Sequence, residues 1–498
     1  MAGIKSLVKD TAIYGVSSII GRFLNWLLVP LYTAKFVPAE YGVVTNIYAY
    51  IALVLVFLTY GMETGFFRFA KRNEHSLASV YTSILSSIGF TSMLFIALLW
   101  MFIDPISSLM GYADGKSSFV LMMGITVAID AFISIPFAYL RFKQRPIRFA
   151  YLKMVNIGLN IGLNLFFILL CPWLYEVAPD TISWFYDPTY GIGYIFVANI
   201  ISTGAMLVLL LPEICAEKFS FDATLLRTML KFSWPLLIAG LAGIMNQNID
   251  KIIYPFLFEN KEIANHQLGI YGANYKIAMV MIMFIQAFRF AYEPLMFSKK
   301  NEDKATKNKE YADAMKYYII AALLIFLGMV FYMDVFQYVL GPQYREGLQI
   351  IPIVLITYLV QGVVYNLSLW YKLIDKTMYG AWFSIVGFVI TLIINIVFVP
   401  KYSYWASASA SLVSYVVMML LSYFIGQKYY AISYPMKSIG VYCLLTAGLW
   451  IAGTVVEIPN FWLRMSYRTV LLVVFLVYLV KKDLPLSEIP VLKKCVKK

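Results

Sequence analysis

Long apolar runs dominate this chain of 498 residues and restrict what it can fold into. A run of about 20 apolar residues is the length at which an α-helix crosses the hydrocarbon core of a bilayer. The runs are continuous rather than alternating, which favours helices over the strands of a membrane barrel. Charged residues make up only 13% of the chain, against about 25% in soluble domains. The sequence therefore predicts an all-α polytopic membrane protein.

The apolar runs predict about fourteen transmembrane helices. We place them at residues 11–34, 41–62, 79–103, 117–140, 150–173, 191–211, 231–257, 270–297, 315–334, 350–371, 380–400, 405–426, 437–455 and 464–481.

Basic residues gather in loops on one side of these predicted spans. They are Lys5, Lys9, Lys71, Arg72 and the basic segments 141–148, 299–309 and 481–498. Loops rich in lysine and arginine stay in the cytoplasm, so we expect both termini there. The same loops account for the net charge of +13 without a nucleic-acid partner.

The two halves of the chain resemble each other. YGVVTNIYAY begins at Tyr41 and YGANYKIAMV begins at Tyr271, an offset of 230 residues, and segment 145–167 matches segment 376–398 at an offset of 231. NWLLVP at 25–30 also matches DKIIYP at 250–255. A repeat unit with an even number of spans keeps its orientation, so the halves should be related by an axis along the membrane normal.

This duplication predicts two six-helix lobes with a cleft between them. We assign residues 1–226 to the N-lobe, 227–436 to the C-lobe, and 437–498 to two extra helices and a basic cytoplasmic tail. The first, second, seventh and eighth spans are equivalent pairs in the two halves, and they are expected to line the cleft.

Arg22 lies in the middle of the first predicted span. An arginine at the bilayer centre costs about 2.5–3.5 kcal/mol on insertion scales, so it should face a wet cavity or a negative partner. We predict a substrate-binding set on the cleft-lining spans; its members are Arg22, Lys276, Arg289, Lys251, Asn25 and Asn246. The alternative for each cation is a structural ion pair or a side chain that snorkels to the interface.

Four carboxylates are candidates to carry a coupling proton or sodium ion: Asp250, Asp130, Glu63 and Glu293. We favour Asp250, although it can also neutralise the adjacent Lys251. Glu293 lies four residues after Arg289, so the two can pair on one helix face. Asn156, Asn160 and Asn164 form a stripe that either binds hydroxyl groups or holds helices together.

No enzyme motif is present in the sequence. It has no P-loop, HExxH or GxSxG pattern, and its four cysteines are scattered, so we expect no catalytic residues, metal site or cofactor beyond a coupling ion. The longest outer loop, residues 175–193, is acidic and aromatic. It either contacts a glycan or forms an ordered cap with interfacial rings.

The opening TAIYGVSSIIGRFLNWLLVPLYTAKFVPAEYGVVTNIYAY at 11–50 resembles the multidrug/oligosaccharidyl-lipid/polysaccharide exporter superfamily, as do its counterparts at 232–257 and 268–278. Within it, the chain resembles bacterial polysaccharide flippases that export O-antigen, the lipopolysaccharide glycan. The resemblance implies a place in the bacterial inner membrane, and we expect a monomer because the two lobes can form a complete cavity in one chain. It would move an undecaprenyl-pyrophosphate-linked oligosaccharide to the outer leaflet by alternating access. The implied partners are membrane lipid, glycosyltransferases and a polysaccharide polymerase. Arg22 matches a cavity arginine typical of that branch.

Two other functions compete with this interpretation. An ion-coupled multidrug exporter of the same superfamily would need an apolar or acidic pocket, which the basic residues of the cleft disfavour. A membrane glycosyltransferase or polymerase would need acidic catalytic residues in large outer loops, and the predicted outer loops are short.

Overall fold

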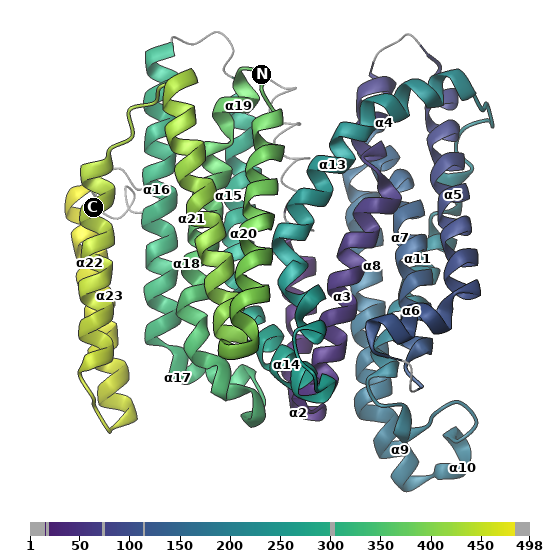
Figure 1. Ribbon diagram of the computed structural model, residues 1–498, viewed down its shortest axis with the longest axis horizontal. Helices are drawn as coiled ribbons and strands as arrows, with labels where there is room; N and C mark the ends of the chain where they lie inside the picture. The colour runs from purple at the N-terminus through teal and green to yellow at the C-terminus, as the bar shows by residue number, and fades with distance from the viewer. Residues whose placement is uncertain (1–14, 16–18, 72–74, 113–114, 299–303, 484–498) are drawn as a thin grey trace, which may run out of the picture.

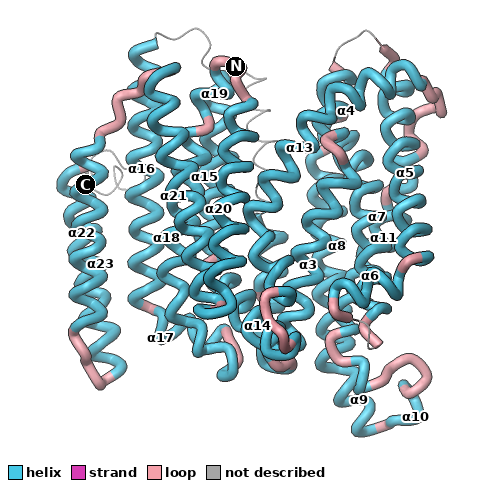
Figure 2. The backbone as a smooth tube through the Cα atoms, in the orientation of Figure 1, coloured by secondary structure: helices cyan, strands magenta, loops and turns pink. Residues whose placement is uncertain are grey.

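A computed structural model describes residues 15, 19–71, 75–112, 115–298 and 304–483, except the side chains of 291, 293–298 and 304. Every regular element in these residues is a helix, which confirms the all-α prediction, and short loops join the helices (Figure 2). The first half contains α2 (Leu28–Lys35), α3 (Pro38–Thr59), α4 (Met62–Ala70), α5 (Leu77–Met101), α6 (Ile103–Met110), α7 (Ser117–Phe142), α8 (Pro146–Leu165), η1 (Phe166–Leu170), α9 (Cys171–Val177), α10 (Pro179–Ile182), η2 (Pro188–Tyr190), α11 (Gly193–Leu209) and α12 (Leu211–Ile214). The second half contains α13 (Ala223–Ile253), η3 (Tyr254–Phe256), α14 (Lys261–Ile277), α15 (Met279–Ser298), α16 (Lys304–Phe331), α17 (Met333–Phe336), η4 (Gln337–Val339), η5 (Pro342–Ile350), α18 (Ile351–Leu367), α19 (Leu369–Leu373), α20 (Met378–Tyr402) and α21 (Tyr404–Tyr429), followed by α22 (Met436–Val455) and α23 (Phe461–Lys482).

Most predicted spans have a counterpart among these helices. Within the described residues, 11 helices are long and apolar enough to cross a bilayer, and the bent pair α14–α15 makes 12 if it counts as one span. The predicted span 191–211 corresponds to α11, an apolar helix of 17 residues. Residues 11–14 and 16–18 of the predicted span 11–34 fall outside the described residues, so the count of fourteen stays a prediction.

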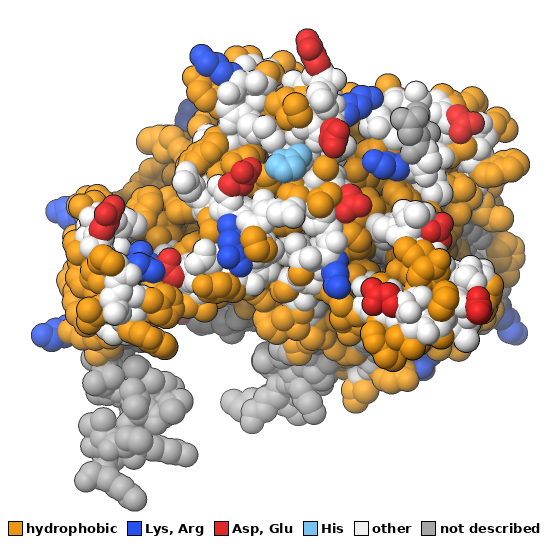
Figure 3. All heavy atoms as spheres, turned by 90° about the horizontal axis from the view of Figure 1, so that it is seen from below, with side chains coloured by type: hydrophobic (Ala, Val, Ile, Leu, Met, Phe, Trp, Pro, Cys, Tyr) orange, Lys and Arg blue, Asp and Glu red, His pale blue; other side chains and the backbone are white. Residues whose placement is uncertain are grey.

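The helices form two groups that separate toward one end of the molecule (Figure 1). We call this end, where α4 and α19 lie, the upper end, and the opposite end, where α2, α10 and α17 lie, the lower end. The described parts of the basic segments lie at the upper end, which the positive-inside prediction places in the cytoplasm. The lower end carries acidic and basic side chains side by side (Figure 3).

Helices α3 and α14 join the two groups near the lower end, where glycines let their backbones touch. A Cβ atom at Gly42 would lie 1.9 Å from the carbonyl oxygen of Asn265, and one at Gly269 would lie 1.9 Å from that of Pro38. A Cβ at Gly272 would lie 2.4 Å from the hydroxyl of Thr45. Gly42 and Gly272 occupy equivalent positions in the sequence repeat, so the duplicated motif forms the junction between the halves.

Helix α13 connects the groups diagonally. Near its start Phe232 packs on α4, where the guanidinium of Arg68 lies 4.1 Å from the Phe232 ring centre. Near its end Asn246 bonds α20 and α21, because its Oδ1 accepts from Thr391 at 3.1 Å and from Ser414 at 2.9 Å. This helix therefore couples the upper end of one group to the interior of the other.

The extra helices α22 and α23 pack against α16 and are bonded to its group at both ends. At the lower end Oδ2 of Asp334 accepts from Arg464 and Arg468, each at 2.8 Å. At the upper end Asp483 accepts from Lys316 at 2.8 Å and from Tyr442 at 2.5 Å. Burial alone would raise the pKa of Asp483, but the two hydrogen bonds and the charges of Lys316 and Lys482 together hold the pKa below its ordinary value.

Replacing Asp334 by Asn should loosen the lower end of α23. One acceptor oxygen would then face two guanidinium groups without its negative charge, at a site where Asp334 is 27% exposed. We expect a loss of about 1–2 kcal/mol in the free energy of unfolding, read as a lower unfolding temperature in detergent. Glu457→Gln, at an exposed position in the α22–α23 loop, is the matched control and should leave that temperature unchanged. An equal effect of both changes would contradict a specific role for the Asp334 bonds.

Candidate functional site

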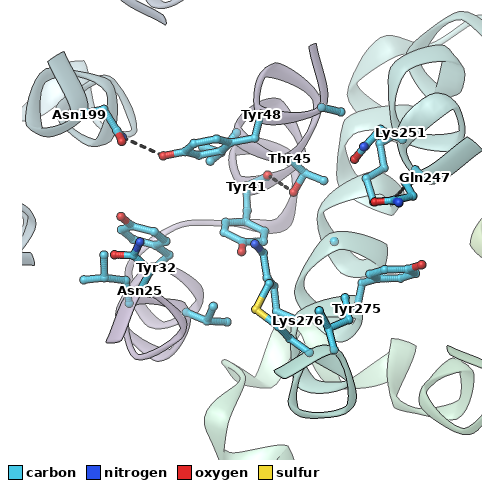
Figure 4. Close-up of a pocket in the computed structure, with 18 of the residues that line it drawn as sticks. Asn25, Tyr32, Tyr41, Thr45, Tyr48, Asn199, Gln247, Lys251, Tyr275 and Lys276 are labelled. Carbon is cyan, nitrogen blue, oxygen red and sulfur yellow. Dashed lines mark hydrogen bonds between the residues drawn. The ribbon is translucent and has the colours of Figure 1, made fainter. Parts of the chain in front are cut away.

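A cavity of about 510 Å³ lies between the two helix groups. One wall comes from α2, α3, α7, α8 and α11, and the other from α13, α14, α15, α18 and α21. The lining is largely polar and aromatic. Tyr48 and Asn199 lie on one side of the cavity and Lys251 and Gln247 on the other, with Lys276 between them (Figure 4).

Lys276 projects into this cavity from the last turn of α14. The chain bends by 44° after this turn, before α15 begins. Trp26 stabilises the break because its indole N–H donates to the Lys276 carbonyl at 2.8 Å. Among the described residues no carboxylate lies within 4 Å of the Lys276 ammonium, so this cation is available to a ligand.

Lys251 also lines the cavity, but it has an acidic partner. Its ammonium lies 3.2 Å from both carboxylate oxygens of Asp250, which is 1% exposed. Tyr271 donates a further bond of 2.6 Å to Asp250. Asp250 therefore accepts from both Lys251 and Tyr271. It largely neutralises the charge of Lys251, which is the alternative that their adjacency in the sequence suggested.

Arg22 belongs to the helical segment 19–26 and lies between the two groups. A Cβ at Gly21 would lie 2.6 Å from Ile157 on α8, and one at Gly15 would lie 3.0 Å from Phe290 on α15. The Arg22 side chain is exposed, and its charge acts on Lys276. It has no carboxylate partner within the described part of the chain. Asn25, one turn later, lines the cavity itself.

The wall of the first half carries a connected set of amides and hydroxyls. Asn199 donates to the hydroxyl of Tyr48 at 2.7 Å, and Asn160 donates to Asn199 at 3.3 Å and to Ser202 at 3.2 Å. Asn164 accepts from Tyr32 at 2.8 Å and so holds α2 against α8. The asparagine stripe of α8 therefore both holds neighbouring helices together and contributes side chains to the cavity.

Asp130 lines the same wall and has a cation beside it that sequence reasoning missed. The charge of Lys153 on α8 acts on the Asp130 carboxylate, although the two described side chains form no ion pair within 4.0 Å. The predicted span begins at residue 150, only three residues before Lys153. Helix α8 begins at Pro146, which places Lys153 about two turns inside.

The remaining predicted residues differ in their relation to the cavity. Arg289 is not part of the cavity lining; its guanidinium lies 4.6 Å from the ring centre of Tyr365. Glu63 pairs with Arg141 at 2.6 Å at the upper end. Asn246 lines the cavity, but Thr391 and Ser414 occupy its oxygen. The side chain of Glu293 lies outside the described residues.

A family model and several solved structures resemble this chain. A model of the polysaccharide biosynthesis protein family matches residues 7–300, and no curated protein matches the chain. The fold is similar to that of the lipid II flippase MurJ in an inward closed conformation, with 15% identity, 94% of this chain and 98% of that chain covered, and a TM-score of 0.73. An inward-facing multidrug resistance MATE transporter of the MOP superfamily gives 13% identity, 82% and 95% coverage, and a TM-score of 0.64. The MATE multidrug transporter DinF-BH gives 14% identity, with 84% of this chain and 95% of that chain covered, and a TM-score of 0.58. With the family model matching more than half of its length, the chain belongs to the polysaccharide biosynthesis protein family and has the fold of the MOP superfamily.

Proposed function

We propose that this protein is a flippase for an undecaprenyl-pyrophosphate-linked oligosaccharide, the repeat unit of O-antigen or of another surface polysaccharide. It would carry the head group from the cytoplasmic to the outer leaflet of the bacterial inner membrane. The observation that carries this proposal is a pair of cations without a described carboxylate partner. Lys276 lines the polar cavity, and Arg22 is not part of the lining but its charge acts on Lys276.

A pyrophosphate cannot cross hydrocarbon unaided, because an unpaired charge in an apolar medium costs tens of kcal/mol. A guanidinium and an ammonium replace the lost water with charge-assisted hydrogen bonds. The amides and hydroxyls around Asn199 would receive the first sugars, whose hydroxyl groups both donate and accept. The prenyl chain would stay in the bilayer.

Alternating access requires a closed end and an open end. The lower end is held shut by bonds between the groups, because Tyr344 donates to the carbonyl of Phe36 at 2.8 Å and Gly341 N–H donates to Thr33 at 3.1 Å. In the predicted orientation the cavity would therefore load from the cytoplasm. Release would require these bonds to part while the upper ends of the groups come together.

The acidic residues of the cavity argue against a multidrug exporter that binds organic cations. Asp250 is paired with Lys251, and the charge of Lys153 acts on Asp130. The cations Lys276 and Arg22 have no described carboxylate partner, and they suit an anionic head group. Either Asp130 or Asp250 could still carry a coupling proton or sodium ion. Flipping that is insensitive to both a protonophore and sodium removal would exclude such coupling.

Deletion of the gene tests the proposed function directly. The mutant should accumulate lipid-linked glycan that an impermeant lectin cannot label on spheroplasts, and the intact gene should restore labelling. We expect membrane glycosyltransferases to supply the lipid-linked glycan, and a polymerase to receive it after it reaches the outer leaflet. Glycan that is fully accessible to the lectin in the deletion strain would overturn the proposal, and hypersensitivity to cationic drugs alone would favour the exporter.

A further inference from the structure

An aromatic groove of about 520 Å³ lies at the lower end of the first helix group, apart from the central cavity. We call it the aromatic cradle. Its rings come from η1, the loop after α10, η2 and the start of α11, and polar groups lie at its rim. The lining consists of Phe167, Ser183, Trp184, Phe185, Tyr186, Asp187, Tyr190, Tyr194 and Val197.

Most of the cradle lies beyond the hydrocarbon core. The continuous helix from α8 to α9 covers Pro146–Val177, 32 residues, and is about 48 Å long, whereas the core is about 30 Å thick. Figure 1 shows α9 and α10 extending below the lower ends of the neighbouring helices. Trp184 is 82% exposed there. A large ring in water beside a groove needs an explanation other than lipid contact.

The ring arrangement is preformed. Tyr194 stacks on Tyr186 with ring centres 4.9 Å apart and on Phe167 at 5.0 Å. The Trp184 ring lies edge-on to Phe185 at 4.8 Å, and its indole N–H donates to the Thr181 carbonyl at 3.1 Å. The exposed Trp184 ring is therefore held against partly and fully buried rings, which lowers the entropy cost of binding a ligand.

Asp187 gives the cradle a polar acceptor. Its Oδ1 accepts from the backbone and the hydroxyl of Thr189 at 2.8 and 2.7 Å. These bonds hold the pKa of Asp187 below its ordinary value, so the carboxylate is charged at neutral pH. A negative charge here repels phosphate, but the carboxylate can accept hydrogen bonds from hydroxyl groups. Apolar faces with a few convergent polar groups are typical of small-ligand sites.

A pyranose ring fits this chemistry, because one face carries C–H groups that pack on an aromatic ring and its edge carries hydroxyls. The cradle also continues a polar stripe from the cavity. Asn156 and Asn160 line the cavity, Asn164 follows one turn later, and Phe167 lines the cradle, so all four lie along one face of the helix. The bond from Tyr32 to Asn164 separates the two sites.

We infer that the aromatic cradle binds neutral sugar residues of the transported glycan as they leave the cavity at the lower end. This inference rests on the proposed function, because it takes the transported molecule to be a glycan. It assigns the ligand to the sugars and not to the phosphate or the lipid. The cradle would hold the emerging glycan once the Tyr32–Asn164 bond opens, and so disfavour its return.

The test uses the full protein in nanodiscs and the native sugar without lipid or phosphate. The probe is the soluble oligosaccharide that mild acid releases from the lipid-linked glycan accumulated in the deletion strain. Saturation-transfer NMR should show sugar signals with the wild type and about five- to tenfold weaker binding with Trp184→Ala. Trp184→Phe should retain most of the binding because a ring remains. Trp173→Ala is the matched control, since Trp173 is 57% exposed on α9 but does not line the cradle.

Two results would overturn the inference: no binding by the wild type, or equal binding by the wild type and Trp184→Ala. Arg22→Gln separates the two proposals, because it should lose export while binding the soluble sugar normally. Normal export by Arg22→Gln would count against the proposed function, whereas normal sugar binding by Trp184→Ala would count against the cradle alone.

Discussion

Replacing Arg22 by Gln should abolish detectable export of the glycan while the protein still inserts and folds. The guanidinium can give a phosphate two parallel charge-assisted hydrogen bonds, each worth about 1.5–3 kcal/mol, whereas a neutral amide gives a weaker one. Loss of one such bond alone corresponds to roughly a 10- to 150-fold decrease in flipping. The measurement is surface polysaccharide, with lectin labelling of spheroplasts, in the deletion strain complemented by each variant.

Further variants make this result specific to the cationic site. Lys276→Gln should have an effect of similar size because its ammonium also lacks a described partner. Arg22→Lys should be partly active, since the charge remains but the bidentate geometry is lost. Lys218→Gln removes an exposed cation outside the cavity and should export normally. Wild-type export by Arg22→Gln, at equal protein level in the membrane, would remove the basis of the proposed mechanism.

The sequence could predict the parts of this protein that depend on hydropathy and repetition. Apolar length placed most spans. The motif shared by Tyr41 and Tyr271 marked two of the four spans expected to line the cleft, and the corresponding helices α3 and α14 contact each other between the halves. The adjacency of Asp250 and Lys251 correctly suggested local neutralisation. These inferences succeed because they depend on residues that are neighbours in the chain or on a pattern that occurs twice.

Features that depend on helix ends and on rotation about the helix axis could not be predicted in the same way. The predicted span 270–297 is divided at Ala278, where the sequence has neither proline nor glycine, and the break is stabilised from a distance by Trp26. Lys153 was missed because α8 starts earlier than hydropathy suggests. Arg289 lies on a cleft-lining span, but its ring contact with Tyr365 places it away from the cavity lining. Contacts of this kind join residues far apart in sequence.

A single methyl group added at Gly269 should destabilise the whole protein. The new Cβ would lie 1.9 Å from the carbonyl oxygen of Pro38 and 3.0 Å from the backbone nitrogen of Gly42, and neither backbone atom can rotate away. Helices α3 and α14 would have to separate by more than 1 Å, because a carbon and an oxygen need more than about 3 Å. We expect Gly269→Ala to cost about 3 kcal/mol or more in the free energy of unfolding.

Separation of these helices would also weaken the bonds that close the lower end. Asn46 on α3 donates to the carbonyl of Lys251 at 2.7 Å, and this bond depends on the spacing of the groups. The measurement is the unfolding temperature in detergent, followed by size-exclusion chromatography. Gly448→Ala in α22 is the matched control, because nothing lies within 4 Å of its added Cβ. That change should be neutral or stabilise the protein by up to about 1 kcal/mol through helix propensity. If Gly269→Ala unfolds at the wild-type temperature, the close contact of α3 and α14 does not hold the two groups together.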